Sequence, residues 1–356
     1  MTGAAEKVNL LGMPKAKLEA FFETLGEKRF RAQQVLQWMH QRGVDDFDQM
    51  TNMSKSLREQ LKEVAEIRGP EVVYDETSKD GTRKWVMRMD NGNSVETVLI
   101  PDGERGTLCV SSQIGCSLDC TFCSTGKRGF NRNLTAAEII GQVWVARRAF
   151  MPFDPNDRPI TNVVMMGMGE PLANYDNVMA SIKVLNDAQG LNIGARHITL
   201  STVGLVPQIL KLAEEALQIN LAISLHAPDN VTRSQTMPVN RRYPVEELIR
   251  ACHKYADLTN RRIFFEYVLL KEQNDSIDQA RKLGRLLNGL HCHVNLIPVN
   301  PTKQGPFERT DLQSAKEFQG GLKQYGIPST IRMEKGIDIN AGCGQLRERA
   351  VDILGT

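Results

Sequence analysis

The sequence of 356 residues lacks the features that mark membrane, secreted or strongly charged proteins. No apolar run reaches the ~18 residues of a membrane-spanning helix, and residues 1–7 carry no apolar core of a secretory signal. Neither sign of charge dominates, because 44 basic residues offset 42 acidic residues to give a net charge of +2. We therefore expect a cytoplasmic enzyme without a membrane partner. The charge balance neither proves nor excludes a nucleic-acid partner, since such binding depends on local patches.

Cysteine is scarce, with seven residues at irregular spacing. An odd number without a secretory segment points to metal or redox chemistry in a reducing compartment. Three of them, Cys116, Cys120 and Cys123, form a triplet at spacing C-x3-C-x2-C. Three thiolates from one loop can bind three irons of a [4Fe-4S] cube. The fourth iron then lacks a protein ligand, and an open metal position is where a substrate or cofactor can bind.

Two other interpretations of this cysteine triplet stay open at this point. Positions i, i+4 and i+7 share one helical face, so the triplet could consist of core residues. Gly115, Gly126 and Gly129 interrupt the apolar pattern around it and favour a loop. A zinc site needs four ligands, usually in two close pairs, and no second pair is present, although Cys109 could supply a fourth thiolate.

The first part of the chain, residues 1–68, is predicted to form a helical accessory domain. Apolar residues recur at helical spacing over three stretches, 15–25, 30–42 and 54–65. By direct count the domain holds 11 basic and 10 acidic residues, so it presents no obvious electrostatic surface for RNA.

A change of pattern at Gly69-Pro70 begins a predicted β-extension over residues 69–106. Residues 84–89 alternate between apolar and polar, 90–93 carry turn residues, and 94–100 resume a strand pattern. The remainder, 107–356, alternates between strand and helix patterns. Strands are expected at 107–111, 162–167, 197–202, 220–225, 263–270, 293–298 and 329–333, and helices at 134–149, 178–189, 206–217, 245–256, 277–290 and 312–325.

This alternation predicts parallel strands joined by crossover helices. Six or seven units are too few for an eight-fold barrel, so the predicted fold is α/β, a partial (βα)6 barrel with its chemistry at the C-terminal ends of the strands. The residues at or just after these strand ends are small or polar except for one leucine: Gly169, Glu170, Ser201, Ser224, Leu225, His226 and Asn300. A carboxylate and hydroxyls there can bind an ammonium and ribose hydroxyls, and glycine lets a ligand approach the backbone. With the cysteine triplet, they describe a site for a small zwitterionic nucleoside.

The strings around these residues resemble the RlmN/Cfr family of radical S-adenosylmethionine (SAM) enzymes, which methylate adenine in RNA. The cysteine triplet resembles the radical SAM signature, and 167–170 resembles the glycine-rich stretch of that superfamily. Further strings extend the likeness over nearly the entire chain: VSSQIGC at 110–116, FCST at 122–125, GFNRNL at 129–134, VVMMGMGEPL at 163–172 and AGCGQL at 341–346. Within the family the chain is most similar to enzymes that methylate carbon 2 of an adenine in 23S rRNA and certain tRNAs.

The resemblance also implies a reaction. A [4Fe-4S] cluster on the cysteine triplet would cleave SAM to a 5′-deoxyadenosyl radical, and two SAM molecules would be used per turnover. Cys343 would take a methyl group from one SAM and, after loss of a hydrogen atom, join it to adenine as an RNA–protein thioether. Cys109 would resolve the thioether by forming a disulfide with Cys343, and Glu96 would accept a proton. The glycines on both sides of Cys343 would give it mobility.

The same resemblance implies ligands and partners. The residues at the strand ends named above would contact SAM. The expected partners are 23S rRNA, tRNA and an external flavodoxin-like electron donor, with residues 1–68 binding RNA and the chain acting as a monomer. Basic residues that could touch phosphate are Lys127, Arg128 and Arg132, with Arg241, Arg242, Arg261 and Arg262 as further candidates.

Several residues have simpler interpretations when they are taken alone. Cys109 in an apolar strand would be a buried inert thiol, and Glu96 on a strand would face solvent. His226 could be a core histidine, and Cys252 and Cys292 are interpreted as packing residues. Two other functions also stay open: a related enzyme of the Cfr type that methylates carbon 8 of adenine, and a non-catalytic RNA-binding protein stapled by zinc.

Overall fold

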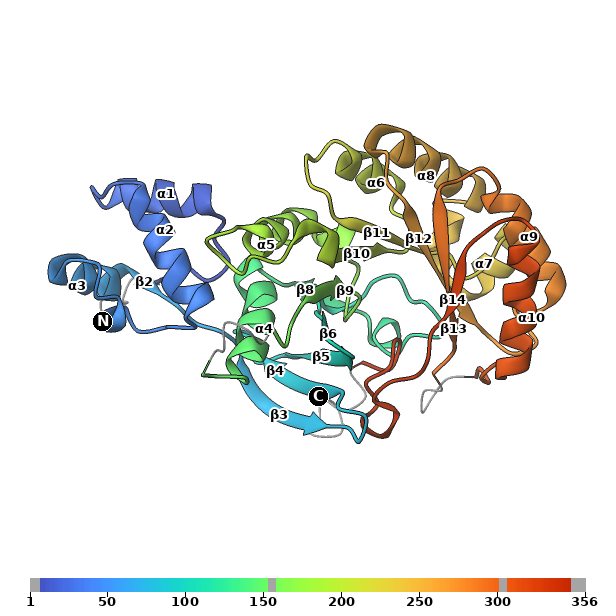
Figure 1. Ribbon diagram of the computed structural model, residues 1–356, viewed down its shortest axis with the longest axis horizontal. Helices are drawn as coiled ribbons and strands as arrows, with labels where there is room; N and C mark the ends of the chain where they lie inside the picture. Colours follow the sequence, from blue (N-terminus) through green and yellow to red (C-terminus); the bar gives the residue numbers. More distant parts are fainter. Residues whose placement is uncertain (1–6, 153–157, 301–305, 347–356) are drawn as a thin grey trace.

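The computed structural model describes residues 7–152, 158–300 and 306–346. Its main feature is a mixed sheet of ten strands in the order β14-β13-β12-β11-β10-β9-β6-β5-β4-β3 (Figure 1). Within the described ranges no helix is both long and apolar enough to cross a membrane.

The larger part of the sheet is parallel, as each neighbouring pair from β6 to β14 shows. Its strands are β6 (Arg105–Cys109), β9 (Asn162–Met165), β10 (Ile198–Thr202), β11 (Asn220–Ser224), β12 (Ile263–Leu269), β13 (Cys292–Pro298) and β14 (Ser329–Ile331). The crossover helices are α4 (Ala136–Arg148), α5 (Tyr175–Asn186), α6 (Val206–Ala213), α8 (Val245–Thr259), α9 (Ile277–Leu287) and α10 (Leu312–Lys323). The prediction of a partial (βα)6 barrel is therefore confirmed.

Helix α9 illustrates how the sequence builds these crossovers. The Ser276 hydroxyl caps its start by accepting a hydrogen bond from the Gln279 N–H at 3.3 Å. Ala280, Leu283 and Leu287 follow at spacings of three and four, and all are fully buried. The helix is thus fixed by its cap and by one apolar stripe that faces the barrel.

The predicted β-extension is continuous with the barrel sheet. Strands β3 (Glu71–Thr77), β4 (Arg83–Arg88) and β5 (Ser94–Asp102) pair antiparallel with one another. Strand β5 also pairs antiparallel with β6, the first strand of the barrel. Any side chain on the inner face of β4 or β5 can therefore contribute to the same site as the barrel strands.

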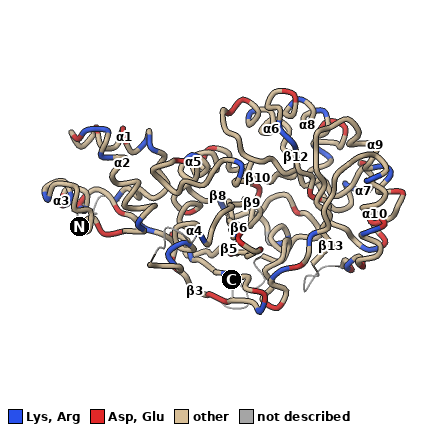
Figure 2. The backbone as a smooth tube through the Cα atoms, viewed as in Figure 1, with Lys and Arg blue, Asp and Glu red and all other residues tan. Residues whose placement is uncertain are grey.

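The N-terminal helices lie at one end of the molecule (Figure 1). They are α1 (Lys15–Thr24), α2 (Phe30–Leu36) and α3 (Lys55–Val64), and the short strands β1 (Val8–Asn9) and β2 (Ala65–Glu66) pair beneath them. The predicted helix 30–42 changes to a π-helix at Gln37–Gln41. The backbone carbonyls of this π-helix accept hydrogen bonds from two side chains of α4, Trp144 Nε1 to Met39 O at 2.9 Å and Arg147 Nη1 to His40 O. Lys, Arg, Asp and Glu are interspersed along these helices (Figure 2).

Candidate functional site

The register of the sheet brings predicted site residues onto one face. Directly paired residues point to the same face, and so do residues two apart along a strand. Val98, two residues after Glu96, pairs with Cys109. The pairings then run through β9 and β10 to Ser201 and on to Ser224 on β11. These four predicted residues therefore share the inner face.

The opposite face of the sheet packs against the crossover helices. Tyr267 of β12, for example, stacks on Phe318 of α10 with ring centroids 5.1 Å apart. Polar residues such as Ser201 and Ser224 therefore lie on the inner face, away from this apolar packing. The site is thus on the side of the sheet that α10 does not cover.

The cysteine triplet lies in a loop and not on a helix. The loop begins after strand β7 (Gln113–Gly115), and a short 3-10 helix, Gly126–Arg128, leads into strand β8 (Phe130–Asn133). Strands β7 and β8 pair antiparallel and close the base of the loop. Inside it, the Cys116 N–H donates to Gly129 O and the Cys123 N–H donates to Cys120 O, each at 3.0 Å. The interpretation as three residues on one helical face is therefore wrong.

The thiols of the triplet lie close together in a poorly hydrated place. Cys120 is buried, and the other two are partly buried. Burial raises the pKa of Cys116 to about 12, with the nearby Glu170 and Cys123 adding to the effect. Burial raises the pKa of Cys120 as well, and Cys123 and Cys116 add to it. Such thiols ionise when they bind a metal, because its positive charge offsets the burial.

A cluster of several irons fits this arrangement. Among the described residues, no three His, Cys, Asp or Glu side chains converge on a point where one ion could be held. A [4Fe-4S] cube does not require that convergence, because each of its cysteines binds a different iron. Three neighbouring thiols on one loop therefore fit the cube as ligands.

Glu170, which follows β9, is hydrogen-bonded to residues at the ends of two other strands, β10 and β7. It is buried, and its carboxylate accepts hydrogen bonds from the Leu172 N–H at 3.0 Å and the Val203 N–H at 2.9 Å. Its own N–H donates to Gln113 Oε1 at 2.8 Å, beside the triplet loop. Burial raises the pKa of Glu170 to about 7, although these N–H donors oppose the rise. Each carboxylate oxygen still has a lone pair with which to accept a bond from a ligand ammonium.

The glycines before Glu170 have a reason that sequence reasoning missed. Gly169 has φ +96°, and a Cβ there would lie 2.4 Å from Gln113 Cβ. A Cβ on Gly167 would lie 2.7 Å from Val110 O. Close packing of protein against protein therefore requires glycine at these positions, whatever ligand approaches them.

His226 touches the triplet loop through an aromatic contact. The residue is buried with φ +57°, and its ring meets Phe122 edge-on with centroids 4.9 Å apart. Its Nδ1 accepts a hydrogen bond from the Val268 N–H at 3.0 Å, so the hydrogen is assigned to Nε2. Burial lowers the pKa of His226 to about 3, and the positive charge of Arg233 contributes. A neutral imidazole therefore backs the loop, next to fully buried Leu225 and partly buried Ser224.

Arg233 is a site residue that the sequence analysis missed. It lies on the short helix α7 (Asn230–Thr236), is fully buried, and donates to neutral oxygens on Val203, Ser224, Leu225, Asn240 and Tyr243. Burial lowers the pKa of Arg233 to about 10, which still leaves it a cation near neutral pH. Its field also reaches Cys120. A buried positive charge thus stands beside the triplet loop.

Cys343 is carried on a C-terminal segment, 341–346, that lies against the triplet loop. The Ser124 N–H donates to Gly344 O at 2.8 Å, and the Thr125 hydroxyl donates to Leu346 O at 3.1 Å. Asn300 Nδ2 donates to Cys343 O at 3.2 Å. Asn300, predicted to contact SAM, therefore also holds the segment that carries Cys343.

Cys109 and Cys343 lie close enough to influence each other. Burial raises the pKa of the Cys109 thiol, and the Cys343 thiol is the second cause. Cys343 keeps exposed surface, yet withdrawal from bulk water raises the pKa of its thiol, followed by the negative charge of Glu266. Glu266 is buried on the inner face and accepts from Asn295 Nδ2 at 2.8 Å. The sequence analysis missed Glu266, although a carboxylate within an otherwise apolar strand could have indicated it.

Glu96 is fully buried, which makes the expectation of a solvent-facing strand residue wrong. Strand β5 lies between β4 and β6, and its residues 94–99 are buried on both faces of the sheet. The Lys84 ammonium, also fully buried, lies 3.3 Å from Glu96 Oε2 and donates to Asn340 O at 3.0 Å. Sequence reasoning missed Lys84, because its place on the same face as Glu96 follows from the pairing of β4 with β5, in which Lys84 lies opposite Val98.

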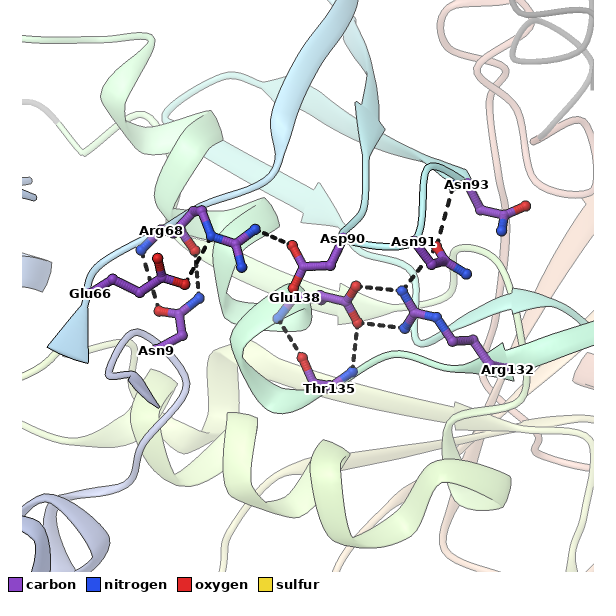
Figure 3. A network of polar contacts seen from close by, with 9 residues as sticks. All are labelled: Asn9, Glu66, Arg68, Asp90, Asn91, Asn93, Arg132, Thr135 and Glu138. Carbon is purple, nitrogen blue, oxygen red and sulfur yellow. Dashed lines mark hydrogen bonds and ion pairs between the residues drawn. The ribbon is translucent and has the colours of Figure 1, made fainter. Parts of the chain in front are cut away.

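Arg132 is occupied within the protein (Figure 3). It forms a two-bond ion pair with Glu138 at 2.6 and 2.7 Å and donates to Asn91 Oδ1 at 3.1 Å. Arg68 forms ion pairs with Glu66 and Asp90 in the same network. These contacts hold β8 to α4 and to the turn between β4 and β5. Arg132 is therefore committed to internal structure and is a poor candidate for a phosphate contact.

The other basic candidates are spread over the molecule. The side chain of Arg128 lies outside what the structure describes. Arg261 and Arg262 directly precede β12 and lie at the N-terminal edge of the sheet, away from the strand ends that carry the site. Arg261 Nη1 donates to Ile219 O at 2.9 Å.

Comparison with known proteins gives concordant similarities. The pattern described as the ribosomal RNA large subunit methyltransferase N-terminal domain matches residues 8–67, and that of the radical SAM superfamily matches 110–283. The chain is 68% identical over 354 residues to the dual-specificity RNA methyltransferase RlmN of Marinobacter nauticus, covering 99% of this chain and 96% of that protein. It is 52% identical over 355 residues to the protein of the same name from Pseudomonas fluorescens, covering 99% and 93%. A crystal structure of a radical SAM methyltransferase from Sphaerobacter thermophilus superimposes with a TM-score of 0.90 at 46% identity, covering 96% of this chain and 99% of that one.

Proposed function

The chain belongs to the RlmN family of radical SAM RNA methyltransferases, and we propose that it methylates carbon 2 of an adenine in 23S rRNA and in tRNA. Membership implies SAM and a [4Fe-4S] cluster as cofactors. The observation that carries the proposal is the juxtaposition of Cys343 with Cys109 and with the triplet loop.

The chemistry of adenine explains why two kinds of cysteine are needed. Carbon 2 is electrophilic, and so is the methyl group of SAM, so a direct polar transfer has no driving force. When bound on Cys116, Cys120 and Cys123, the cluster together with SAM supplies a 5′-deoxyadenosyl radical that accepts a hydrogen atom. The protein must then provide the carbon on which this radical acts.

Cys343 provides that carbon. Its thiolate attacks the methyl group of one SAM, a sulfur–carbon bond forms, and S-adenosylhomocysteine leaves with the electron pair. The new S-methyl group loses one hydrogen atom to the radical derived from a second SAM, so that two SAM molecules are used per turnover. Its carbon then bonds to carbon 2 of adenine. The flavodoxin-like carrier supplies the one electron that cleaves SAM. Once oxidised, it takes one electron back from the adduct as Glu96 accepts the proton from carbon 2, which leaves a closed-shell thioether.

Cys109 releases the product. Its thiolate attacks the Cys343 sulfur, and a disulfide forms as the sulfur–methylene bond breaks. The electron pair of the broken bond goes to the methylene carbon, which takes a proton to become the methyl group. Two electrons from the carrier then reduce the disulfide. The proximity of the two thiols supports this step.

The remaining residues are assigned to binding. Gly169, Glu170, Ser201, Ser224, Leu225, His226 and Asn300 form the SAM site in this proposal. Residues 1–68 act as the RNA-binding accessory domain, 69–106 as the β-extension, and 107–356 as the barrel with its catalytic cysteine segment. Buried Glu170 suits the SAM ammonium, because a carboxylate held by backbone N–H groups is ready to accept a further bond.

The test is an anaerobic assay with reconstituted cluster, SAM, a reductant and an rRNA fragment. Wild type should form 2-methyladenosine, Cys343→Ala should form none, and Cys109→Ala should accumulate RNA bound covalently to protein. Cys292→Ala, which changes a buried cysteine outside the proposed site, is the matched control and should resemble wild type.

Other outcomes would overturn the proposal in distinct ways. Mass spectrometry that finds 8-methyladenosine would replace it with the carbon 8 reaction. Tight zinc in a colourless protein, in place of iron, sulfide and absorption near ~400 nm, would favour the non-catalytic alternative. Full turnover by Cys109→Ala would remove the resolving role.

A further inference from the structure

Lys84 occupies an unusual place for a lysine. It lies on β4 with its side chain fully buried, and its ammonium is 3.3 Å from Glu96 Oε2, which is itself fully buried. Burying either charge alone would cost several kcal/mol, so the two are tolerated because they are paired. Neither the cluster nor SAM is required to explain this pair. Its position on the inner face, in register with Cys109 through Val98, does call for an explanation.

The same ammonium reaches the segment that leads to Cys343. It donates to Asn340 O at 3.0 Å, three residues before the cysteine. Asn340 directly follows the 3-10 helix Ile337–Ile339 and has φ +51°. Its carbonyl is therefore not used within a continuing helix and can face β4. The red C-terminal segment returns to the light-blue strands β3 and β4 in Figure 1. Lys84 therefore contacts both the strand of Glu96 and the segment of Cys343.

Two neighbouring contacts fix the approach of this segment. The Ser78 hydroxyl donates to Asp338 Oδ1 at 2.5 Å, and the Gly336 N–H donates to Asp80 Oδ2 at 2.9 Å. Both come from the hairpin between β3 and β4, and both precede Asn340 in the segment. Lys84 contacts Asn340, which is nearer in the chain to Cys343 than either Gly336 or Asp338.

We propose that Lys84 is a positioning residue that pairs with the carboxylate of Glu96, the proton acceptor, and ties it to the backbone that leads to Cys343. This inference rests on the proposed function, since it assumes that Glu96 takes the proton from carbon 2. The proton leaves a carbon that has just bonded to the group on Cys343, so acceptor and cysteine must keep a fixed relation. One ammonium that touches both provides it.

Other charged or titratable groups also face the pair. On β3, Glu76 lies directly opposite Lys84 in the strand register. Tyr74, whose hydroxyl donates to Glu76 at 2.7 Å, lies on the same face. On β6 the neighbour is Cys109, and on the C-terminal segment it is Cys343. Both neighbouring thiols have a raised pKa, from burial first. Glu76 faces Lys84 from β3, and Glu266 and Arg332 carry further charges near Cys343.

The experiment measures the single-turnover rate of methylated adenosine formation at pH 7. Lys84→Met should be at least about tenfold slower, because the carboxylate that accepts the proton loses the contact that fixes its position. Lys84→Arg keeps a cation at this position and should restore most of the rate.

Two further variants separate positioning from folding. Lys84→Met removes the ammonium beside a buried carboxylate, so the double variant Lys84→Met/Glu96→Gln, which removes both charges, serves if the single variant unfolds. The double variant should be no slower than Glu96→Gln alone. A wild-type rate in folded Lys84→Met would overturn the inference, and so would a double variant slowed by a further tenfold or more. Absence of methylated adenosine from the wild type would instead sink the proposed function.

Discussion

The segment of the cysteine triplet and the segment of Cys343 are held in opposite ways. The triplet loop stands on a paired hairpin base, β7 with β8, and Cys120 is buried within it. The Cys343 segment has no such pairing in the described residues and is held by contacts from separate elements, among them Lys84, Asn300 and Ser124. A cluster needs ligands at fixed distances, whereas in the proposed reaction Cys343 meets a methyl donor and then Cys109, and so has to move. The difference in construction matches these two tasks.

The largest effect expected from this comparison follows from removing a rigid ligand. Cys120→Ala should abolish cluster binding and reduce RNA methylation to background, because two thiolates cannot hold the three irons. Iron and sulfide content and the visible absorption of anaerobically purified protein measure this directly. Cys292→Ala is the control, since it is equally buried on a barrel strand. A Cys120→Ala protein with a full complement of iron would break the comparison.

The two segments should also respond to pH with opposite sign. Burial raises the pKa of Glu170, which anchors the triplet side, from 4.5 to about 7. A raised carboxyl pKa contributes stability that is present below pH 4.5 and lost as the pH rises through about 7, and that loss amounts to at most about 3 kcal/mol. Urea unfolding at pH 5 and pH 8 should show this loss in wild type and a smaller one in Glu170→Gln.

Asp80, which anchors the Cys343 side, behaves in the reverse sense. Burial opposes its ionisation, but hydrogen bonds from the Gly336 N–H and Thr82 N–H outweigh it and lower the pKa of Asp80 to about 2. The stability that the Asp80 carboxylate contributes is therefore present above pH 3.8 and lost as the pH falls through about 2. Asp80→Asn should weaken this dependence at acid pH and leave the behaviour between pH 5 and pH 8 unchanged. If the free energy of unfolding of Glu170→Gln depended on pH as that of wild type does, this difference between the two segments would be contradicted.

The hairpin base gives a prediction of intermediate size. Arg132→Met removes the two-bond ion pair with Glu138, whose carboxylate is mostly buried. We expect the free energy of unfolding to fall by about 1–3 kcal/mol, because Glu138 loses charge-assisted partners. Arg68→Met, at an exposed pair of the same network, is the control and should cost less than about 1 kcal/mol. Equal losses of unfolding free energy in Arg132→Met and Arg68→Met would show that the ion pair of Arg132 with Glu138 does not stabilise the base of the loop more than an exposed pair does.

The smallest effect is expected where the Cys343 segment is held by a single amide. Asn300→Ala removes the hydrogen bond to Cys343 O and should cost about 1 kcal/mol locally, which raises the open population roughly fivefold. Alkylation of Cys343 by iodoacetamide, followed by mass spectrometry, should quicken by a similar factor. The reactivity of Cys123 serves as the internal control. A slower reaction at Cys343 would show that Asn300 does not restrain the segment.

The sequence was informative where local pattern decides the outcome. Alternating strand and helix signals correctly predicted the partial barrel, and the glycines around the cysteine triplet correctly predicted a loop. Burial of Glu96 and Lys84 could not be predicted, because it depends on β5 pairing with β6 across the boundary of the expected β-extension. Arg233 was missed for a related reason. Its helix spans seven residues of mostly polar character, and its acceptors come from distant loops.

Helix α4 is held near both ends. Near its start, Glu138 binds Arg132 of the strand that closes the cysteine-triplet loop, and near its end Trp144 and Arg147 donate to the π-helix of the N-terminal part. Its 13 residues span roughly 20 Å. One helix thus couples the position of the N-terminal helices to that of the base of this loop.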